Sequence, residues 1–227
     1  ELPILKHIDA ESVDEALFWL HHSGEKAKVI SGGTDLLNLL KDRVKGPKLH
    51  VPEILVNIKP VREMNQITYD ENTGLSIGST VTLNRIETSA VIRQNFNVLL
   101  MASRQVGTTQ IRNMGTIGGN LCQRPQCMYF RHPHFTCFKK GGAKCFAITG
   151  EHRDYHSILA KGKCVMAHPS DMAIVLIALN AKAIIASRYK VNEIPLEDFF
   201  VGGNHLTETV LESDELVREI RVPQRKP

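Results

Sequence analysis

Val29-Ile30-Ser31-Gly32-Gly33-Thr34-Asp35-Leu36 places a glycine pair between two apolar segments. The apolar run 27–30 before the pair has the length of a short buried strand, and residues 36–41 after it have the periodicity of a helix. Glycines allow the backbone to approach a ligand closely, and the amides that begin a helix point toward an anion. The stretch therefore predicts a strand, a turn and a helix that bind a pyrophosphate. A plain tight turn, capped by Thr34 or Asp35, would explain the same residues.

The residues on either side of this stretch predict a small parallel α/β unit. Ser12-Val13-Asp14-Glu15 is a capping box that begins a helix, and Gly24 suits the end of that helix. Residues 54–58 form a second buried strand. Helix, strand, turn, helix and strand follow one another within residues 1–59, which we take as an N-terminal subdomain.

From residue 60 to residue 227 the pattern becomes that of an α+β subdomain with a largely antiparallel sheet. Asp171 suits the cap of a strongly apolar helix that runs to Leu179. Thr82 suits the cap of a short helix, and residues 99–106 suit the end of a longer one. Strands are expected at 75–78, 183–186, 189–194 and 216–222.

Composition narrows the classes of function. The chain has 227 residues, 42% of them hydrophobic and 23% charged, as in an ordinary soluble globular protein. It contains no run of about 18 apolar residues, so no membrane span is expected. Scattered positive residues and an aromatic content of 6% disfavour nucleic-acid binding. Without a signal-peptide pattern at the N-terminus, we expect a cytoplasmic protein, or a periplasmic one if it is exported with a partner.

A second glycine turn, Gly115-Thr116-Ile117-Gly118-Gly119-Asn120, lies in a mostly polar connection. Arg112 is suited to neutralise a phosphate, and Asn113 or Asn120 to bond a ring edge or a ribose; a structural loop with a solvated arginine is the alternative. The first turn, residues 31–35, lacks the G-x-G-x-x-G spacing of a Rossmann fold. Two such turns from two subdomains predict a ligand in the cleft between them.

All five cysteines fall between residues 121 and 167. This region is rich in Lys, His, Gly and Pro, so it cannot hold its shape by burying hydrocarbon. Disulfides, a zinc site or an iron–sulfur cluster would each stabilise the structure of this region. The odd number of cysteines and the absence of a secretion signal favour metal ligation over disulfides. The C-x2-C knuckles of structural zinc sites are missing. The cysteines are Cys122, Cys127, Cys137, Cys145 and Cys164.

In its two glycine segments, residues 29–36 and 106–121, the sequence resembles the FAD-binding (medium) subunits of molybdenum hydroxylases. These are relatives of xanthine dehydrogenase, carbon monoxide dehydrogenase and 4-hydroxybenzoyl-CoA reductase. Residues 55–58, 75–82 and His168-Pro169-Ser170-Asp171 fit the same pattern. The resemblance implies a two-subdomain FAD-binding fold of the vanillyl-alcohol-oxidase (PCMH) type, with a small parallel α/β subdomain and a larger antiparallel-sheet subdomain with helices.

The resemblance also implies that FAD contacts both glycine segments and the start of the later helix. The implied residues are Val29, Ile30, Ser31, Gly32, Gly33, Thr34, Asp35, Leu36, Thr108, Ile111, Asn113, Thr116, Gly118, Gly119, Asn120 and Asp171.

The cysteine-bearing insertion, at about 121–167, is similar to that of the aldehyde oxidoreductase and 4-hydroxybenzoyl-CoA reductase flavin subunits, which carry an additional [4Fe-4S] cluster. The stretch 119–133 looks especially like the aldehyde oxidoreductase type. The family pattern implies the ligands Cys122, Cys137, Cys145 and Cys164 and leaves Cys127 as a spare thiol. The gap from Cys145 to Cys164 departs from the reductase, so Cys127 stays open as an alternative ligand. Nearby histidines are interpreted as polar loop residues.

The resemblance implies an electron-transfer subunit of an oxidoreductase complex, without substrate chemistry or catalytic residues of its own. Its partners would be a small [2Fe-2S] subunit, a large molybdopterin subunit and an external carrier such as ferredoxin. Members usually continue into a C-terminal domain after a strand like 216–223, and this sequence stops at Pro227. We therefore expect that domain to be absent, through a split gene or a short form. The alternatives are a stand-alone FAD oxidase with structural zinc and a non-enzymatic zinc-binding module.

Overall fold

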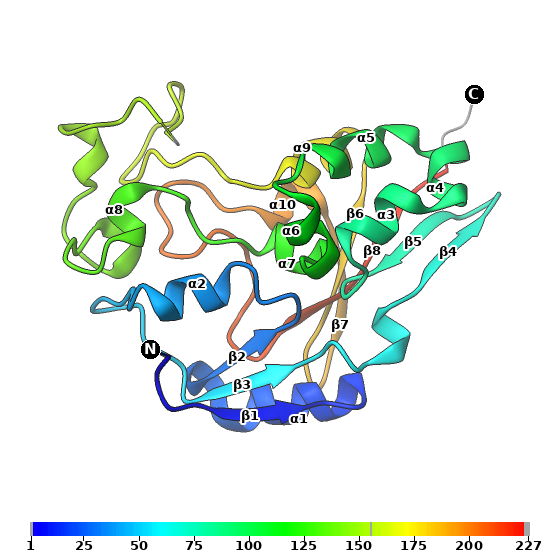
Figure 1. The fold of residues 1–227 in the computed structure, drawn as a ribbon, viewed down its shortest axis with the longest axis horizontal. Helices are drawn as coiled ribbons and strands as arrows, with labels where there is room; N and C mark the ends of the chain where they lie inside the picture. Colours follow the sequence, from blue (N-terminus) through cyan, green and yellow to red (C-terminus); the bar gives the residue numbers. More distant parts are fainter. Residues whose placement is uncertain (1, 155, 225–227) are drawn as a thin grey trace.

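A computed structural model describes residues 2–154 and 156–224 of the chain. Two sheets form its framework, a small parallel one and a larger antiparallel one, and helices cover both (Figure 1). The α+β fold with a small parallel and a larger antiparallel part is confirmed.

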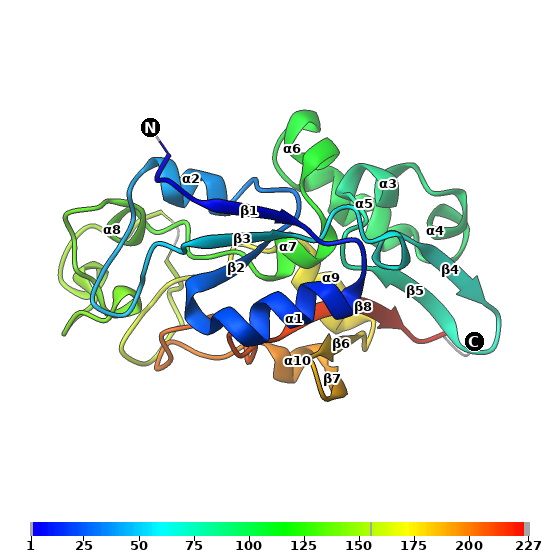
Figure 2. The ribbon, with the colours of Figure 1, turned by 90° about the horizontal axis from the view of Figure 1, so that it is seen from below.

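The small sheet carries the first glycine segment. It has the strand order β1 (Lys6–Asp9), β3 (Ile54–Asn57), β2 (Ala27–Ile30), and all neighbours are parallel. Helix α1 (Val13–Ser23) runs across one face of this sheet (Figure 2). Helix α2 (Leu36–Lys41) follows the glycine turn after β2. The strands expected at 27–30 and 54–58 and the helices expected on either side of 27–30 are therefore confirmed.

The cap of α1 follows the predicted pattern with one difference. The Ser12 hydroxyl accepts a hydrogen bond from the Glu15 amide at 3.1 Å. The Glu15 carboxylate reaches back one residue further than expected, to the Glu11 amide at 2.9 Å. These two bonds, one of which satisfies an orphan amide of the first turn, fix the start of the helix.

The larger sheet is antiparallel and brings the last strand to its centre. Its order is β4 (Ile67–Asp70), β5 (Gly74–Gly78), β8 (Leu216–Val222), β6 (Lys182–Ala186), β7 (Val191–Pro195). Strand β8 pairs with β5 on one side and β6 on the other, and the β6 ladder shifts register between Ile184 and Ile185. The strands expected at 75–78, 183–186 and 216–222 are confirmed, and β7 confirms most of the strand expected at 189–194.

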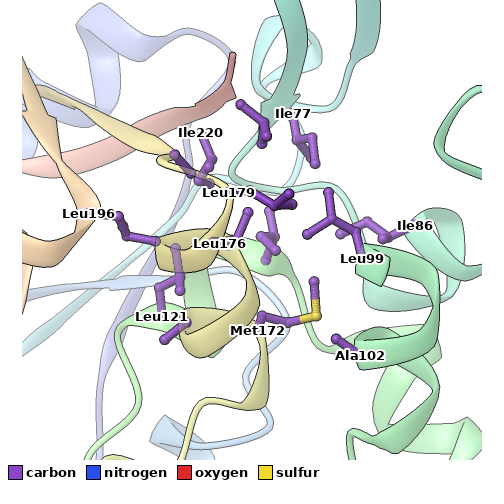
Figure 3. Close-up of a cluster of buried hydrophobic side chains, with 14 of the residues drawn as sticks. Ile77, Ile86, Leu99, Ala102, Leu121, Met172, Leu176, Leu179, Leu196 and Ile220 are labelled. Carbon is purple, nitrogen blue, oxygen red and sulfur yellow. The ribbon is translucent and has the colours of Figure 1, made fainter. Parts of the chain in front are cut away.

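Helices pack on the larger sheet and form the main core. Figure 3 shows Ile77 and Ile220 of the sheet meeting Leu176 of α9 (Asp171–Ala178) and Leu99 of α5 (Asn97–Gln105). Helices α3 (Leu83–Thr88), α4 (Ala90–Asn95) and α10 (Leu196–Phe199) complete this layer. Thr82 caps α3 as predicted.

The cap of α9 differs from the prediction. Ser170, not Asp171, is the N-cap, because its hydroxyl accepts from the Ala173 amide at 3.1 Å, whereas Asp171 is the first helical residue. A serine hydroxyl and an aspartate carboxylate are equally good caps, so sequence alone did not separate the two neighbours.

The two sheets share buried contacts. Leu17 and Leu20 of α1 belong to one apolar cluster with Val56 of β3, Ala186 of β6 and Leu216 of β8. All strands of the small sheet precede residue 60. The boundary near residue 60 stays a prediction.

The second glycine segment and the cysteine stretch contain only short helices. These are α6 (Thr109–Met114), α7 (Ile117–Leu121) and α8 (Met128–Arg131). The cysteine stretch lies beside α2 at one end of the molecule in both views (Figures 1 and 2). In the described part of the chain, no helix combines the length and the apolar character needed to cross a membrane.

Candidate functional site

The two glycine segments line one cavity of about 330 Å³. Every residue from Val29 to Leu36 borders it, and so do Thr116, Gly118 and Gly119 of the second segment. Its size is at the lower end of the range of small-molecule sites, about 300–1,000 Å³. The predicted meeting of the two glycine turns at one ligand site thus has a structural counterpart.

Glycine is required at these turns because backbone and side chains of neighbouring segments leave no room for a Cβ atom. A Cβ on Gly32 would lie 2.2 Å from the Met114 carbonyl oxygen, and one on Gly118 would lie 2.7 Å from the Ser79 Cβ. Gly33 has φ of +70°, a conformation that side-chain-bearing residues rarely adopt. The first segment is therefore in direct contact with the end of α6.

Unpaired polar groups face this cavity. The hydroxyls of Ser31 and Ser79 border it, are buried, and have no hydrogen-bond partner in the described chain. Within the same residues, the amides of Gly32, Gly33 and Thr34 donate to no acceptor. Buried polar groups are rarely left unpaired. These donors are suited to the phosphate oxygens of a nucleotide cofactor.

Five predicted site residues do not border this cavity. The Thr108 hydroxyl caps α6 by accepting from the Ile111 amide at 3.3 Å. The Asn120 side chain is buried and accepts from the Ser170 hydroxyl at 2.6 Å, so it ties α7 to α9. Ile111, Asn113 and Asp171 are exposed.

Arg112 is also engaged within the protein. Its Nε donates to the Glu87 carboxylate at 2.9 Å, and its other nitrogens reach the Val106 and Gly107 carbonyls and the Thr109 hydroxyl. The side chain is thus held as a structural link between α3 and α6, and the expectation that it neutralises a phosphate has no support in this geometry.

Asp35 contacts the cysteine stretch. Its carboxylate accepts a hydrogen bond from the Arg124 backbone amide at 3.0 Å and forms an ion pair with Arg131. Arg124 also pairs with Glu208 at 3.0 Å, and Glu208 pairs with Lys139 at 3.3 Å. Burial raises the pKa of Glu208, whereas the charges of Arg124 and Lys139 lower it. Glu208 could not be found from the sequence, because the loop that carries it has no motif.

A second, smaller cavity is lined by four thiols. Cys127, Cys137, Cys145 and Cys164 border it, together with Pro125, Tyr129, Phe130, Phe138, Lys139 and Met166. None of the five cysteines forms a disulfide. Glu208 borders the first cavity and its ion-pair partner Lys139 borders the second, so this ion pair bridges the two cavities.

Cys122 lies apart from this group. It borders the glycine-lined cavity and packs against the main apolar core. Burial alone raises the pKa of its thiol to about 12. The pKa values of Cys127, Cys137 and Cys164, in contrast, are each also raised by the charge of another cysteine of the group. The structure therefore places Cys127, and not Cys122, with the other three.

Backbone amides surround the grouped thiols. Cys127 directly precedes α8 and accepts from the Phe130 and Tyr129 amides; Cys137 precedes a helical turn at 138–140 and accepts from the Lys140 and Lys139 amides. These bonds lower both thiol pKa values, but burial outweighs them and the net shift is upward. Burial likewise raises the pKa of Cys164 to about 11.

His156 is the one histidine of the stretch that contacts a thiol among the described residues, with 3.1 Å between its Nε2 and the Cys127 Sγ. No three Cys, His, Asp or Glu side chains of the described chain converge closely enough to hold a single metal ion. In an iron–sulfur cubane each cysteine binds a different iron, so the donors of such a cluster need not converge on one ion.

Comparison with known proteins identifies the family. The sequence profile described as the FAD binding domain in molybdopterin dehydrogenase matches residues 4–225. The chain belongs to this family of FAD-binding domains. The orphan hydroxyls, the free amides and the glycine cradle of the larger cavity fit such a cofactor. The aldehyde oxidoreductase FAD-binding subunit PaoB of Escherichia coli is 31% identical over 201 residues, 87% of this chain and 61% of that protein.

The nicotinate dehydrogenase FAD-subunit of Eubacterium barkeri is 28% identical to this FAD-binding domain over 211 residues, 92% of this chain and 55% of that protein. The domain thus spans about three fifths of the length of the curated relatives it matches.

Solved structures show the same fold. Carbon monoxide dehydrogenase from Hydrogenophaga pseudoflava matches with a TM-score of 0.73 at 23% identity, over 100% of this chain and 61% of that chain. Quinoline 2-oxidoreductase from Pseudomonas putida 86 matches with a TM-score of 0.70 at 23% identity, over 99% of this chain and 61% of that chain.

Proposed function

We propose that this FAD-binding domain is the electron-transfer part of a molybdenum hydroxylase complex, an oxidoreductase in which another subunit oxidises the substrate. The observation that carries the proposal is the cavity between the two glycine segments, with its unpaired hydroxyls and amides. The named relatives, an aldehyde oxidoreductase subunit and a nicotinate dehydrogenase subunit, support it.

In this proposal the partners are a small [2Fe-2S] subunit and a large molybdopterin subunit. FAD supplies the exchange of two electrons with one side and of single electrons with the other. The chain binds the cofactor, orients it and limits the access of water. No acid–base group is required for this role.

We further propose that the smaller cavity holds a [4Fe-4S] cluster on Cys127, Cys137, Cys145 and Cys164. Four thiols border this cavity; three of them, Cys127, Cys137 and Cys164, are buried and accept backbone N–H groups, and such thiols are the donors that these clusters use. Cys127 replaces Cys122 in this ligand set, because Cys122 faces the flavin cavity. The resemblance of the cysteine stretch to that of aldehyde oxidoreductase flavin subunits also supports the cluster proposal.

The location of the smaller cavity suits an exit route for electrons to an external carrier such as ferredoxin. The segments at this end of the molecule, residues 41–48 and 144–163, carry more exposed cations than exposed carboxylates (Figures 1 and 2). The cations are Lys41, Arg43, Lys45, Lys48, Lys144, Arg153, Lys161 and Lys163, and the carboxylates are Asp42, Glu151 and Asp154. Such a surface attracts an acidic protein at low salt and loses that attraction at high salt.

The test is anaerobic purification followed by flavin, iron and acid-labile sulfide analysis of matched variants. Cys127→Ser is expected to lose the iron and sulfide and to keep FAD. Cys122→Ser is expected to keep both the iron and the sulfide. A wild-type protein that binds flavin without sulfide would support the stand-alone oxidase instead, and full iron content in Cys127→Ser would refute the ligand set.

A further inference from the structure

A buried lysine beside the thiol-lined cavity has no carboxylate partner. Lys140 is 0% exposed, and its Nζ donates to the His132 carbonyl at 2.8 Å. No carboxylate of the described residues forms an ion pair with it. The neighbouring Lys139 differs: its Nζ pairs with Glu208 at 3.3 Å and donates to the Thr207 carbonyl at 2.8 Å.

Residues 46–48 pack against the backbone and Cβ of Lys140. The Lys48 amide donates to the Lys140 carbonyl at 3.0 Å, and a Cβ on Gly46 would lie 2.6 Å from the Lys140 Cβ. These contacts contribute to the burial of the residue. A buried charge is costly unless an opposite charge balances it.

Lys140 lies close to two thiols: its amide donates to the Cys137 carbonyl at 2.9 Å, and its Nζ bonds the His132 carbonyl at the end of α8, the helix that Cys127 precedes. Burial lowers the pKa of Lys140, and the thiols of Cys137 and Cys127 act against that shift. The surrounding ion-pair network does not supply the missing negative charge. Its cations are Arg124, Arg131 and Lys139, and its carboxylates are Asp35 and Glu208. Positive charge is therefore in excess around the cavity even before Lys140 is added.

We propose that Lys140 is the counter-cation of an iron–sulfur cluster in the thiol-lined cavity and raises the reduction potential of that cluster. The inference rests on the proposed function, which places the cluster there. Iron held by thiolates carries a net negative charge, and this charge grows when the cluster takes up an electron. A fixed cation nearby stabilises the reduced state more than the oxidised one, and net charge near a cluster is one of the factors that set its potential.

The experiment is an EPR-monitored redox titration of the anaerobically purified full chain with its FAD. Lys140→Met removes the charge and keeps the length of the side chain, and Lys140→Arg keeps the charge. Lys140→Gln is a second neutral variant, which retains an N–H donor. Lys144→Met is the matched control, because it removes an exposed cation of the same loop, where water screens the charge.

We expect the midpoint potential of the cluster to fall in Lys140→Met and Lys140→Gln and to stay near the wild-type value in Lys140→Arg and Lys144→Met. Failure of both neutral variants to retain iron, while Lys140→Arg retains it, would also support a counter-charge. Wild-type potentials in iron-loaded neutral variants would overturn the inference. An equal shift of the potential in Lys140→Arg, or loss of iron from all three Lys140 variants, would also overturn it. Either result would mean that the packing of the side chain, and not its charge, causes the effect. A wild-type protein without sulfide would instead refute the proposed function itself.

Discussion

The two glycine segments touch at Gly32, where there is room on the Cα for a hydrogen atom but not for a side chain. A methyl group there would lie 2.2 Å from the Met114 carbonyl oxygen, in backbone that cannot move aside as a flexible side chain would. The glycine pair of the first segment is therefore a packing requirement of the assembled site as well as a turn.

Gly32→Ala is expected to lower the free energy of unfolding by about 1–3 kcal/mol, the usual cost of overpacking. It should also weaken FAD binding, because the two segments move apart. Denaturant unfolding and flavin fluorescence titration measure the two effects. Gly202→Ala is the control, since a Cβ there meets nothing within 4 Å. Equal stability and affinity in both variants would contradict the contact.

His168 gives the protein an acid-sensitive group. Burial, and then the charge of Lys139, lower its pKa from 6.5 to about 4. The unfolded chain takes up a proton as the pH falls below about 6.5, and the folded protein does so only near 4. The contribution of His168 to the free energy of unfolding is therefore complete above pH 6.5 and decreases as the pH falls toward 4.

His168→Asn is expected to flatten the pH dependence of the free energy of unfolding between pH 6.5 and 4, while its side-chain oxygen can still accept from the Ser170 amide. Urea unfolding at a series of pH values is the measurement. The same replacement at the exposed His134 is the control. An unchanged slope in His168→Asn would show that another group carries the acid sensitivity.

At the scale of residues, the predicted FAD contacts of the first segment all border the larger cavity, whereas several of those in the second segment do not. All of residues 29–36 border the larger cavity. Thr108, Asn120 and Asp171 belong to the same family pattern but serve as a cap, an interhelical bond and a helix start. The spacing of Cys122 and Cys127 could not show which thiol faces which cavity, because that depends on the path of the loop between them.

At the scale of elements, two threonines cap the short helices of the second glycine segment, but only one of them borders the larger cavity. Thr116 caps α7 by accepting from the Gly119 amide at 3.3 Å and borders the larger cavity. Thr108 caps α6 in the same way at 3.3 Å but does not border it. Only the first cap therefore positions amides next to the proposed cofactor.

Thr116→Ala and Thr108→Ala are each expected to cost about 0.5–2 kcal/mol of stability, as the loss of a cap does. Only Thr116→Ala should weaken FAD binding beyond the effect of that lost stability. Thermal unfolding and flavin titration of the two variants under identical conditions test this. A comparable loss of FAD affinity in Thr108→Ala would contradict this prediction and would indicate that α6 is part of the binding site.

Elements with continuous apolar runs were predictable, and two polar edge strands were not. Residues 54–57 and 183–186 are apolar strands of the sheet interiors. Lys6–Asp9 and Ile67–Asp70 are edge strands whose residues are mostly polar or exposed, so nothing in their composition separates them from loops. Helix α7 contains Gly118 and Gly119, two residues of low helix propensity, and tertiary contacts override that propensity.

At the scale of the whole molecule, ion pairs between distant segments attach the cysteine stretch to the flavin half. Asp35 and Arg131 are separated widely in sequence, and both side chains are mostly buried, with exposures of 18% and 16%. Neither charge pattern nor spacing reveals such a pair, so the docking of the stretch could not be predicted from the sequence.

A double-mutant cycle with Asp35→Asn and Arg131→Gln is expected to give a coupling energy above about 1 kcal/mol, because the pair is shielded from water. The cycle for the exposed pair Glu151 and Arg153 is the control and should show no measurable coupling. Urea unfolding of the variants supplies the free energies. Additive effects at Asp35 and Arg131 would mean that other contacts attach the stretch.

The central position of β8 constrains the order in which the protein can mature. Strands β5 and β6 do not pair with each other; each pairs with residues 216–222. While the chain is being synthesised, residues 216–222 must emerge from the ribosome before the larger sheet can close. Until then β5 and β6 carry unpaired edges in the nascent polypeptide, which is the stage at which chaperones have most reason to bind it.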